Sequence, residues 1–356
     1  MKNLFLNHKV LVCAGSGGVG KTTVSASLAV AAAHSGLNVL VLTIDPARRL
    51  ATSLGLESGA DEVEVKGVVA KGKLFASIID SKKEFDRFLD ESTSQVDLLK
   101  KIKSNRLYEQ LSTTLSGSQE FTSIIKLYKA VESNKYDLVI LDTPPTQHAI
   151  DFLTAPQKIR DLFQGKITKW FIGDQDQGWL ANLLNKSTQT VLMVLKKLTG
   201  SSFMEELSDF FVSLKEIEAK ISERSEKAHE LLLKESTAFV LITSFDQSKI
   251  FEAKNFYSTL SSGGYNVRQI VVNRAYPMWV KNEGKERAEA IEWRENHFKD
   301  IYLKVKNFYI QKAQVYDNLE QDYQERVDVA KIPEFDHDIY GVEGLKRVAK
   351  EFEIDH

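Results

Sequence analysis

The chain has 356 residues, of which 43% are hydrophobic and 27% are charged, and its formal net charge is −2. This composition is typical of a globular protein and excludes a strong overall field that would attract nucleic acid or an acidic membrane. Cys13 is the only cysteine, which excludes an intrachain disulfide and every metal site built from several cysteines. The sequence has neither a signal-peptide cleavage site nor the roughly 18 uninterrupted apolar residues of a spanning helix. We therefore expect a cytoplasmic protein without nucleic-acid binding or stable membrane insertion.

Short, nearly continuous apolar runs recur along the chain and predict buried parallel strands. Between them lie helical patterns, such as the one from Thr22 to His34, which predict helices on both faces of a sheet. The predicted fold class is therefore α/β, with a doubly wound and mainly parallel sheet. The predicted strands are 9–14, 38–44, 73–79, 136–141, 237–243 and 267–273.

Two stretches between these strands are too long for simple crossovers, and they predict a helical subdomain. In the second stretch, Phe203, Phe210 and Phe211 belong to a run of apolar residues at helical spacing. A charged segment at 283–326 predicts a further surface helix. The whole chain is thus expected to form one domain, 1–356, with a core of 1–81, 134–150 and 236–356 and a helical subdomain of about 82–133 and 151–235.

A glycine-rich segment directly follows the first predicted strand. Residues 15–22 read GSGGVGKT and fit G-x-x-x-x-G-K-[ST] between a strand and a helix, which is the setting of a phosphate-binding loop, or P-loop. Its backbone N–H groups can surround a polyphosphate, and the following helix presents the positive end of its dipole. We expect Lys21 to bridge the β- and γ-phosphates, Thr22 to bind Mg²⁺, and Thr23 to reach the α-phosphate. Further nucleotide contacts are expected from Gly17, Gly18, Val19 and Gly20.

Two aspartates end predicted strands beside this loop. Asp142 stands where P-loop enzymes place a carboxylate that holds Mg²⁺ through water. The alternative role, a helix cap, is less favoured because the two prolines that follow set a specific loop path. Asp45 precedes Pro46, and it could either orient the attacking water or cap the next helix. The residues alone leave these two roles of Asp45 about even.

Several segments together resemble the family of arsenical-pump and tail-anchored-protein-targeting ATPases. The resemblance covers most of the chain but is thin through 156–235 and 276–326. It is nearest to a bacterial subgroup that has serine where the family norm has a P-loop lysine. The segments are GSGGVGKTT (15–23), TIDPARRLATSLG (43–55), LDTPPTQHAIDFL (141–153), VVNR (271–274), and IPEF with GVEGL (332–345).

This resemblance implies a deviant P-loop ATPase that binds Mg·ATP and uses hydrolysis to switch the shape of a dimer. It implies that Asp45 activates water as part of switch I, with Lys21 as the second catalytic residue, and that residues 142–148 form switch II. It also implies that Asn273 contacts adenine beneath a loop that follows Pro333. Judged from the residues alone, Asn273 is only a polar residue at a strand end. No N/T-K-x-D guanine motif follows any predicted strand, which favours ATP over GTP.

Two departures from the family pattern affect these expectations. Ser16 replaces the lysine that usually reaches the partner's phosphates, and such a cation is worth ~10³-fold or more in rate. Hydrolysis is then slow, or it uses Arg48 or Arg49, or it depends on a paralogous subunit that carries the lysine. Cys13, alone in a predicted buried strand, can provide neither a zinc clamp between subunits nor an arsenite site.

The segment 151–235 corresponds to the client-binding part of the targeting ATPases. Phe203, Phe210 and Phe211 share a helix face, with Met193 and Met204 nearby. A client groove favours a flexible, methionine-rich lining, and the chain has only four methionines. Ordinary core packing is favoured by about three or four to one, so no client is assigned.

Three functions follow from these residues. The first is an ATPase that rearranges a homodimer, or a heterodimer with a paralogous ATPase subunit, and acts on an unidentified client. The second is a weakly active regulatory subunit that binds nucleotide and assists a catalytic paralogue, and Ser16 favours it. The third is a positioning ATPase of the partitioning or division-site type, which the lack of a basic run disfavours.

Overall fold

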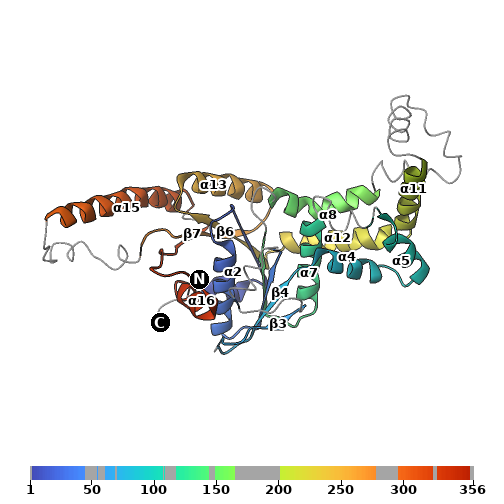
Figure 1. Cartoon of the computed structure of the whole chain (residues 1–356), viewed down its shortest axis with the longest axis horizontal. Helices are drawn as coiled ribbons and strands as arrows, with labels where there is room; N and C mark the ends of the chain where they lie inside the picture. The colour runs from blue at the N-terminus through green and yellow to red at the C-terminus, as the bar shows by residue number, and fades with distance from the viewer. Residues whose placement is uncertain are drawn as a thin grey trace, which may run out of the picture. The chain divides into compact units, whose positions relative to one another are not determined.

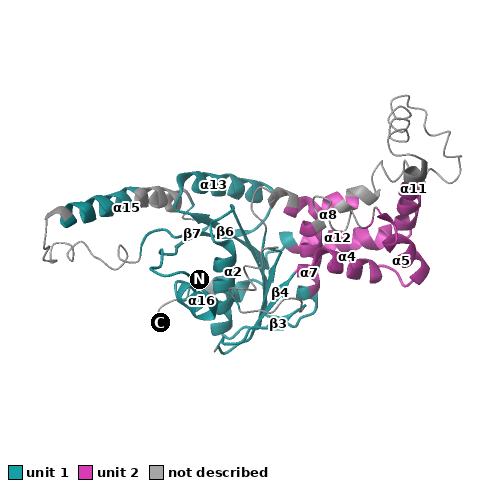
Figure 2. Ribbon diagram, in the orientation of Figure 1, with its two compact units in different colours: residues 1–78, 130–149, 232–356 teal, residues 79–129, 150–231 magenta. Residues whose placement is uncertain are grey.

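The computed structural model describes residues 2–44, 54, 61–68, 70–106, 108, 118–143, 149–164, 201–277, 296–323 and 327–352. The chain divides into two compact units (Figure 2). Unit 1 contains 1–78, 130–149 and 232–356, and unit 2 contains 79–129 and 150–231. The unit borders lie a few residues earlier in the chain than the predicted limits of the helical subdomain.

Unit 1 is built on an eight-stranded sheet with the order β3-β4-β2-β5-β1-β6-β7-β8 (Figure 1). Every neighbouring pair is parallel except β3 with β4. The predicted α/β class and its mainly parallel sheet are confirmed. Sequence patterns missed β3 and β8, which are short and lack a buried apolar run. The strands are β1 (Val10–Gly15), β2 (Val39–Thr43), β3 (Val63–Glu64), β4 (Leu74–Ile78), β5 (Leu138–Asp142), β6 (Thr237–Ser244), β7 (Val267–Asn273) and β8 (Asp328–Lys331).

The central strands β1, β2 and β5 are buried at every residue. Helix α2 (Lys21–His34) packs against β1, β2 and β5, and α16 (Gly341–Ala349) lies beside α2 (Figure 1). All residues of α2 from Val24 to Ala33 are buried, because α2 lies between the sheet and α16. The predicted helix from Thr22 to His34 is therefore confirmed.

The connections of the sheet place the ends of its strands together. The chain leaves β1 through α2 towards β2, and leaves β6 through α13 (Gln247–Ser262) towards β7, in opposite directions along the sheet. Right-handed crossovers therefore put α2 and α13 on opposite faces. Because these strands are parallel, Gly15, Thr43, Asp142 and Asn273 all lie at the same carboxyl edge, where α/β proteins bind ligands.

The remaining helices of unit 1 are α1 (Lys2–Asn7) and α15 (Asn296–Tyr323). Helix α15 forms part of the predicted surface helix 283–326, whose residues 283–295 and 324–326 lie outside the described residues. In the part of the chain that the structure describes, none of the helices combines the length and apolar character needed to cross a membrane.

Unit 2 is helical, as the sequence predicted. Its core contains packed aromatic rings, among which Phe88 and Phe121 meet edge to face with centroids 5.2 Å apart. Phe210 and Phe211 are buried, which agrees with core packing, whereas the side chains of Phe203, Met193 and Met204 lie outside the described residues. The helices are α4 (Ser81–Asp90), α5 (Val96–Lys103), α7 (Ser118–Glu132), α8 (Ala149–Gln164), α11 (Ser201–Lys215) and α12 (Glu218–Leu233).

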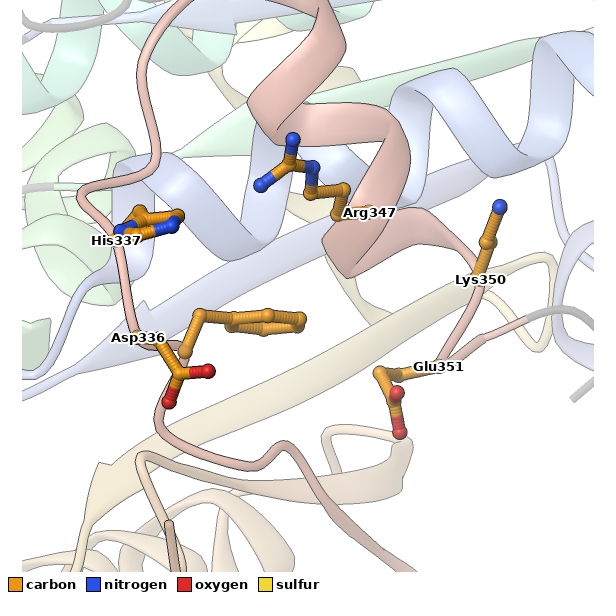
Figure 3. A pocket seen from close by; sticks show the side chains of 6 residues that line it. Asp336, His337, Arg347, Lys350 and Glu351 are labelled. Atoms are coloured by element: carbon orange, nitrogen blue, oxygen red, sulfur yellow. The ribbon is translucent and has the colours of Figure 1, made fainter. Parts of the chain in front are cut away.

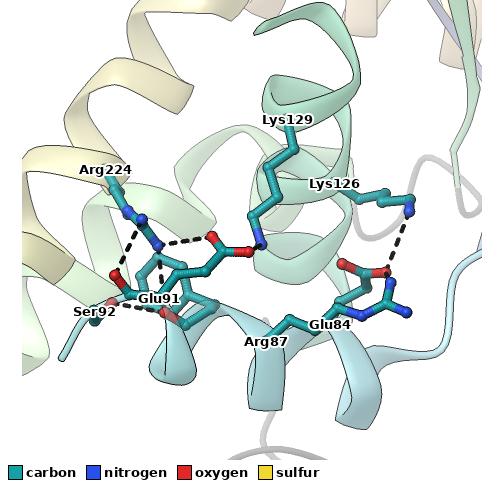
Figure 4. A network of polar contacts seen from close by, with 8 residues as sticks. Glu84, Arg87, Glu91, Ser92, Lys126, Lys129 and Arg224 are labelled. Carbon is teal, nitrogen blue, oxygen red and sulfur yellow. Dashed lines mark hydrogen bonds and ion pairs between the residues drawn. The ribbon is translucent and has the colours of Figure 1, made fainter. Parts of the chain in front are cut away.

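Charged side chains connect three helices of unit 2 (Figure 4). The carboxylate of Glu84 on α4 is 4% exposed and pairs with Arg87 at 2.9 Å and with Lys126 of α7 at 3.4 Å. Glu91 pairs with Lys129 of α7 at 2.9 Å and with Arg224 of α12 at 3.1 Å. These pairs tie α4 to α7 and α12, and the buried Glu84 depends on its cations for solvation.

Candidate functional site

The P-loop lies between β1 and α2, and two of its glycines are required by their surroundings. A Cβ atom on Gly15 would lie 2.0 Å from the backbone oxygen of Ile242 on β6. Gly20 has φ of 86°, and its Cβ would lie 2.3 Å from Nδ2 of Asn273. At Gly15 a larger residue would have to displace the backbone of β6, and at Gly20 it would be strained by the left-handed conformation and would press on the Asn273 side chain.

Lys21 begins α2 and folds back over the loop. Its Nζ donates to the backbone oxygen of Ser16 at 2.9 Å. Thr22 and Thr23 follow it in the first turn, and Gly20 is the N-cap. Because glycine has no side chain, the N-cap residue leaves the first-turn N–H groups to other acceptors, as in helix termini that bind phosphate. Gly17 and Gly18 are exposed and Val19 is buried.

The carboxylate of Asp142 accepts hydrogen bonds from hydroxyl groups of α2 and β2. Thr22 donates to its Oδ2 at 2.7 Å, Thr43 at the end of β2 donates to the same oxygen at 3.1 Å, and Ser25 of α2 donates to Oδ1 at 3.3 Å. The residue is 2% exposed and ends β5 between Cys13 of β1 and Thr43. This carboxylate is therefore held beneath the start of α2.

Cys13 lies directly beside Asp142 in the sheet register. Burial raises the pKa of its thiol to about 12, and the neighbouring Asp142 carboxylate adds to the rise while a hydrogen bond with Ser25 opposes it. The thiol therefore stays protonated and behaves as a small apolar core residue, because only a thiolate is nucleophilic or binds metal.

Ser16 makes a contact outside the motif. It is 3% exposed, and its hydroxyl donates a hydrogen bond to Oε2 of Glu252 on α13. Lys249, one turn earlier in α13, contacts the same carboxylate at 3.0 and 3.2 Å. These two partners lower the pKa of Glu252, with the Ser16 hydrogen bond contributing most. Ser16, which stands where the family norm has a lysine that reaches the partner's phosphates, thus has a hydrogen-bond partner within its own chain.

Asn273 ends β7 and touches the P-loop directly, since its Nδ2 donates to the backbone oxygen of Val19 at 2.9 Å. The chain then runs beside the segment that contains Pro333. Ala275 N donates to the oxygen of Ile332 at 2.8 Å, and Glu334 N donates to that of Tyr276 at 2.6 Å. The β7–β8 pairing thereby extends beyond the strands and carries buried Pro333 to the same edge as Asn273.

The structure brings together residues 15–22, Asp142 and Asn273, whereas several other predicted residues lie outside the described ones. These are Asp45, Arg48, Arg49 and 144–148. Sequence reasoning missed Ser25, Thr43 and Glu252. Ser25 stands one helical turn after Thr22 and Thr43 ends a strand, which are usable local signals. Glu252 has no local signal, because its partner lies 236 positions away.

The donor groups at this edge fit a magnesium ion with a polyphosphate. Mg²⁺ keeps several waters and binds through one or two protein oxygens plus phosphates, and the Thr22 hydroxyl with the Asp142 carboxylate matches that requirement. Among the described residues, no group of three or more His, Cys, Asp and Glu side chains is placed to hold a metal ion by itself.

A hollow of about 330 Å³ lies elsewhere in unit 1, between the segment after β8 and the end of α16 (Figure 3). Its charged lining consists of Arg347 and Lys350 with Asp336 and Glu351, and His337 and Phe335 complete it. The formal charges balance, so the hollow does not favour a polyphosphate as the P-loop does.

Comparison with known proteins agrees with this geometry. ATPase GET3B of Arabidopsis thaliana is 29% identical over 292 residues, which are 76% of this chain and 65% of that protein. ATPase GET3 of Malassezia globosa (strain ATCC MYA-4612 / CBS 7966) is 26% identical over 270 residues, 76% of this chain and 73% of that protein. A protein of Aquifex aeolicus (strain VF5) named as an arsenical pump-driving ATPase is 24% identical over 350 residues, 96% of this chain and 78% of that protein. The family described as anion-transporting ATPase matches residues 8–353, so the resemblance is confirmed and the chain belongs to the anion-transporting ATPase family.

Proposed function

We propose that this member of an ATPase family binds Mg·ATP at the carboxyl edge of its sheet, and that hydrolysis switches the shape of a dimer. The observation that carries the proposal is the contact between Thr22 and Asp142, 2.7 Å from Oγ1 to Oδ2, directly behind the P-loop. A hydroxyl and a carboxylate in this relation are the groups that hold Mg²⁺ beside the phosphates in P-loop enzymes.

Each predicted residue has one role in this proposal. Lys21 neutralises charge on the β- and γ-phosphates, Thr22 ligates Mg²⁺, and Asp142 holds that ion through water. Asp45 positions the attacking water, since phosphoryl transfer depends mostly on alignment and charge placement. Asn273 recognises adenine; its contact with Val19 supports this role by placing the amide beside the P-loop. The other nucleotide contacts come from Gly17, Gly18, Val19, Gly20, Thr23 and Pro333.

The dimer is the second part of the proposal. ATP lies between two subunits, which are either two copies of this chain or this chain and a paralogous ATPase subunit, and their closure is passed to an unidentified client. The family match over 8–353 supports this arrangement. Arsenite is not proposed as an activator, because Cys13 is buried and its raised pKa keeps the thiol protonated.

A second candidate function is a weakly active regulatory subunit. The observation that favours it is the hydrogen bond from Ser16 to Glu252 of the same chain, since a serine hydroxyl supplies no cation to a partner's phosphates. In that case a paralogue would supply the missing positive charge, which is worth ~10³-fold or more in rate.

The test uses the purified full chain with Mg²⁺. Calorimetry should show binding of one ATP per chain, and light scattering should show a change in subunit association between ADP and a non-hydrolysable ATP analogue. Steady-state hydrolysis is then measured with and without a paralogous subunit. Turnover by the chain alone supports the first function, and turnover only in the mixture supports the second. Absence of adenine-nucleotide binding in both preparations would overturn the proposal.

A further inference from the structure

Helix α13 holds the P-loop through one side chain. Ser16 is 3% exposed, and its hydroxyl donates to Glu252 near the start of α13, 236 positions away in the sequence. The two residues follow β1 and β6 respectively, which are adjacent strands of the sheet. The contact therefore links the loop after one strand to the helix after its neighbour.

The carboxylate of Glu252 is also held by a residue of its own helix. Lys249 lies one helical turn away on the same face and contacts both carboxylate oxygens, at 3.0 Å to Oε1 and 3.2 Å to Oε2. A carboxylate accepts a shorter and stronger hydrogen bond from a hydroxyl than a neutral oxygen does. Lys249 and Glu252 together thus present a fixed, charged acceptor to Ser16.

Ser16 passes this constraint to the phosphate-binding lysine. While the Ser16 hydroxyl is bound by Glu252, the backbone oxygen of Ser16 accepts a hydrogen bond from Nζ of Lys21 at 2.9 Å. The side chain and the backbone of Ser16 are therefore each held by a hydrogen bond. The four residues Lys249, Glu252, Ser16 and Lys21 form a continuous chain of polar contacts from α13 to the start of α2.

From this chain we infer that Glu252 is a positioning residue of the phosphate-binding loop. By holding Ser16 within its own subunit, it presets the loop and Lys21 for the triphosphate of a nucleotide. The inference rests on the proposed function and deepens it, because it gives position 16 a role in cis. It also explains how a serine is used at that position without serving a partner subunit.

The experiment compares Ser16→Ala, Glu252→Ala and the double variant with the unmodified full chain. Calorimetry with Mg·ATP measures affinity, and hydrogen–deuterium exchange without nucleotide measures protection of residues 15–22. Each single variant should weaken affinity roughly tenfold, the scale of one hydrogen bond to a charged group. Each should also speed exchange in the loop. The double variant should be no weaker than the weaker single variant, because both changes remove the same contact.

Two further variants separate positioning from general stability. Glu252→Gln keeps an oxygen acceptor and should lose less affinity than Glu252→Ala. Glu223→Gln, in a comparable exposed pair with Lys227 at 2.7 Å on α12, should leave affinity and loop exchange unchanged. Glu252→Ala leaves the buried Ser16 hydroxyl without its acceptor and should lower the melting temperature, whereas the double variant removes both partners and should keep that of the unmodified chain.

Unchanged affinity and unchanged exchange in both Ser16→Ala and Glu252→Ala would overturn the inference. The outcome is distinct from failure of the proposed function, which is absence of ATP binding by the unmodified chain. In that event the exchange experiment still decides whether Glu252 orders the loop, since it uses no nucleotide. Faster exchange of residues 15–22 in the variants then supports the positioning role of Glu252, and unchanged exchange rejects it.

Discussion

The hydroxyl of Thr22 donates to the carboxylate of Asp142 at 2.7 Å, although the two residues are 120 positions apart in the sequence. The contact joins the first turn of α2 to the end of β5, which is the neighbour of β1 in the sheet. One end of the P-loop is therefore anchored to a second strand. The proposed Mg²⁺ site consists of these two side chains.

Lys21→Ala should abolish Mg·ATP binding. The ammonium group is the proposed counter-charge for the β- and γ-phosphates, and alanine cannot replace it. Calorimetry measures the loss, and Lys227→Ala, on an exposed face of α12, serves as a control that should bind normally. Unaltered affinity in Lys21→Ala would show that the nucleotide is held elsewhere.

Asp45→Asn should keep ATP binding and lose turnover. The substitution preserves size but removes the charge that is proposed to orient the attacking water. Phosphate release in a single turnover, measured beside the calorimetric affinity, separates the two effects. Normal hydrolysis by this variant would assign Asp45 to the competing role, a cap for the helix after it.

Asp142→Ala should destabilise the fold and raise the Mg²⁺ concentration needed for ATP binding. The change removes the carboxylate that accepts from Thr22 and Thr43, while Ser25 keeps its hydrogen bond to the backbone oxygen of Lys21 at 2.8 Å. A hydrogen bond to a charged group contributes about 1.5–3 kcal/mol, so urea unfolding should show a loss of at least that order. Asp137→Ala, at the exposed entrance to the same strand, is the matched control and should have a smaller effect with unchanged Mg²⁺ dependence.

Gly20→Ala should weaken ATP binding more than Gly18→Ala. Both glycines have positive φ, 86° and 80°, so each alanine variant incurs the same cost of about 1–2 kcal/mol for a left-handed backbone. Only at Gly20 would the new Cβ collide, 2.3 Å from Nδ2 of Asn273, whereas Gly18 has nothing within 4 Å. Adding Asn273→Ala to Gly20→Ala should recover stability, measured by thermal unfolding. Equal losses in the two glycine variants would contradict the close approach of Asn273.

Stability should fall at alkaline pH in part through Cys13. Its pKa is about 12 in the folded chain and 9.0 for an unperturbed thiol, so the unfolded chain releases this proton first as pH rises. The protonated thiol's contribution to the free energy of unfolding is fully present below pH 9. It is lost between pH 9 and pH 12, at about 1.4 kcal/mol per pH unit. The difference in unfolding free energy between the unmodified chain and Cys13→Ala, followed from pH 8 upwards, measures it. A difference that stays constant with pH would exclude the thiol as the cause.

Local patterns in the sequence were sufficient for the main strands, the P-loop and the carboxylate behind it. Buried parallel strands are recognisable because both of their faces are covered, which requires continuous apolar runs such as those of β1 and β2. The P-loop is recognisable because its motif is contiguous in the sequence, at residues 15–22 between a strand and a helix. The short strands β3 and β8 escaped notice because their residues carry no comparable apolar signal.

What the sequence determined by itself was thus the class of fold, and it located the glycine-rich segment 15–22 and the strand-end carboxylate Asp142. Only the tertiary structure decided which groups these residues meet: Thr43 and Ser25 at Asp142, Val19 at Asn273, and Glu252 at Ser16. The reason is that strand order and register bring together residues 99 to 254 positions apart, and no local periodicity records such distances. The role of position 16 depends on that long-range packing.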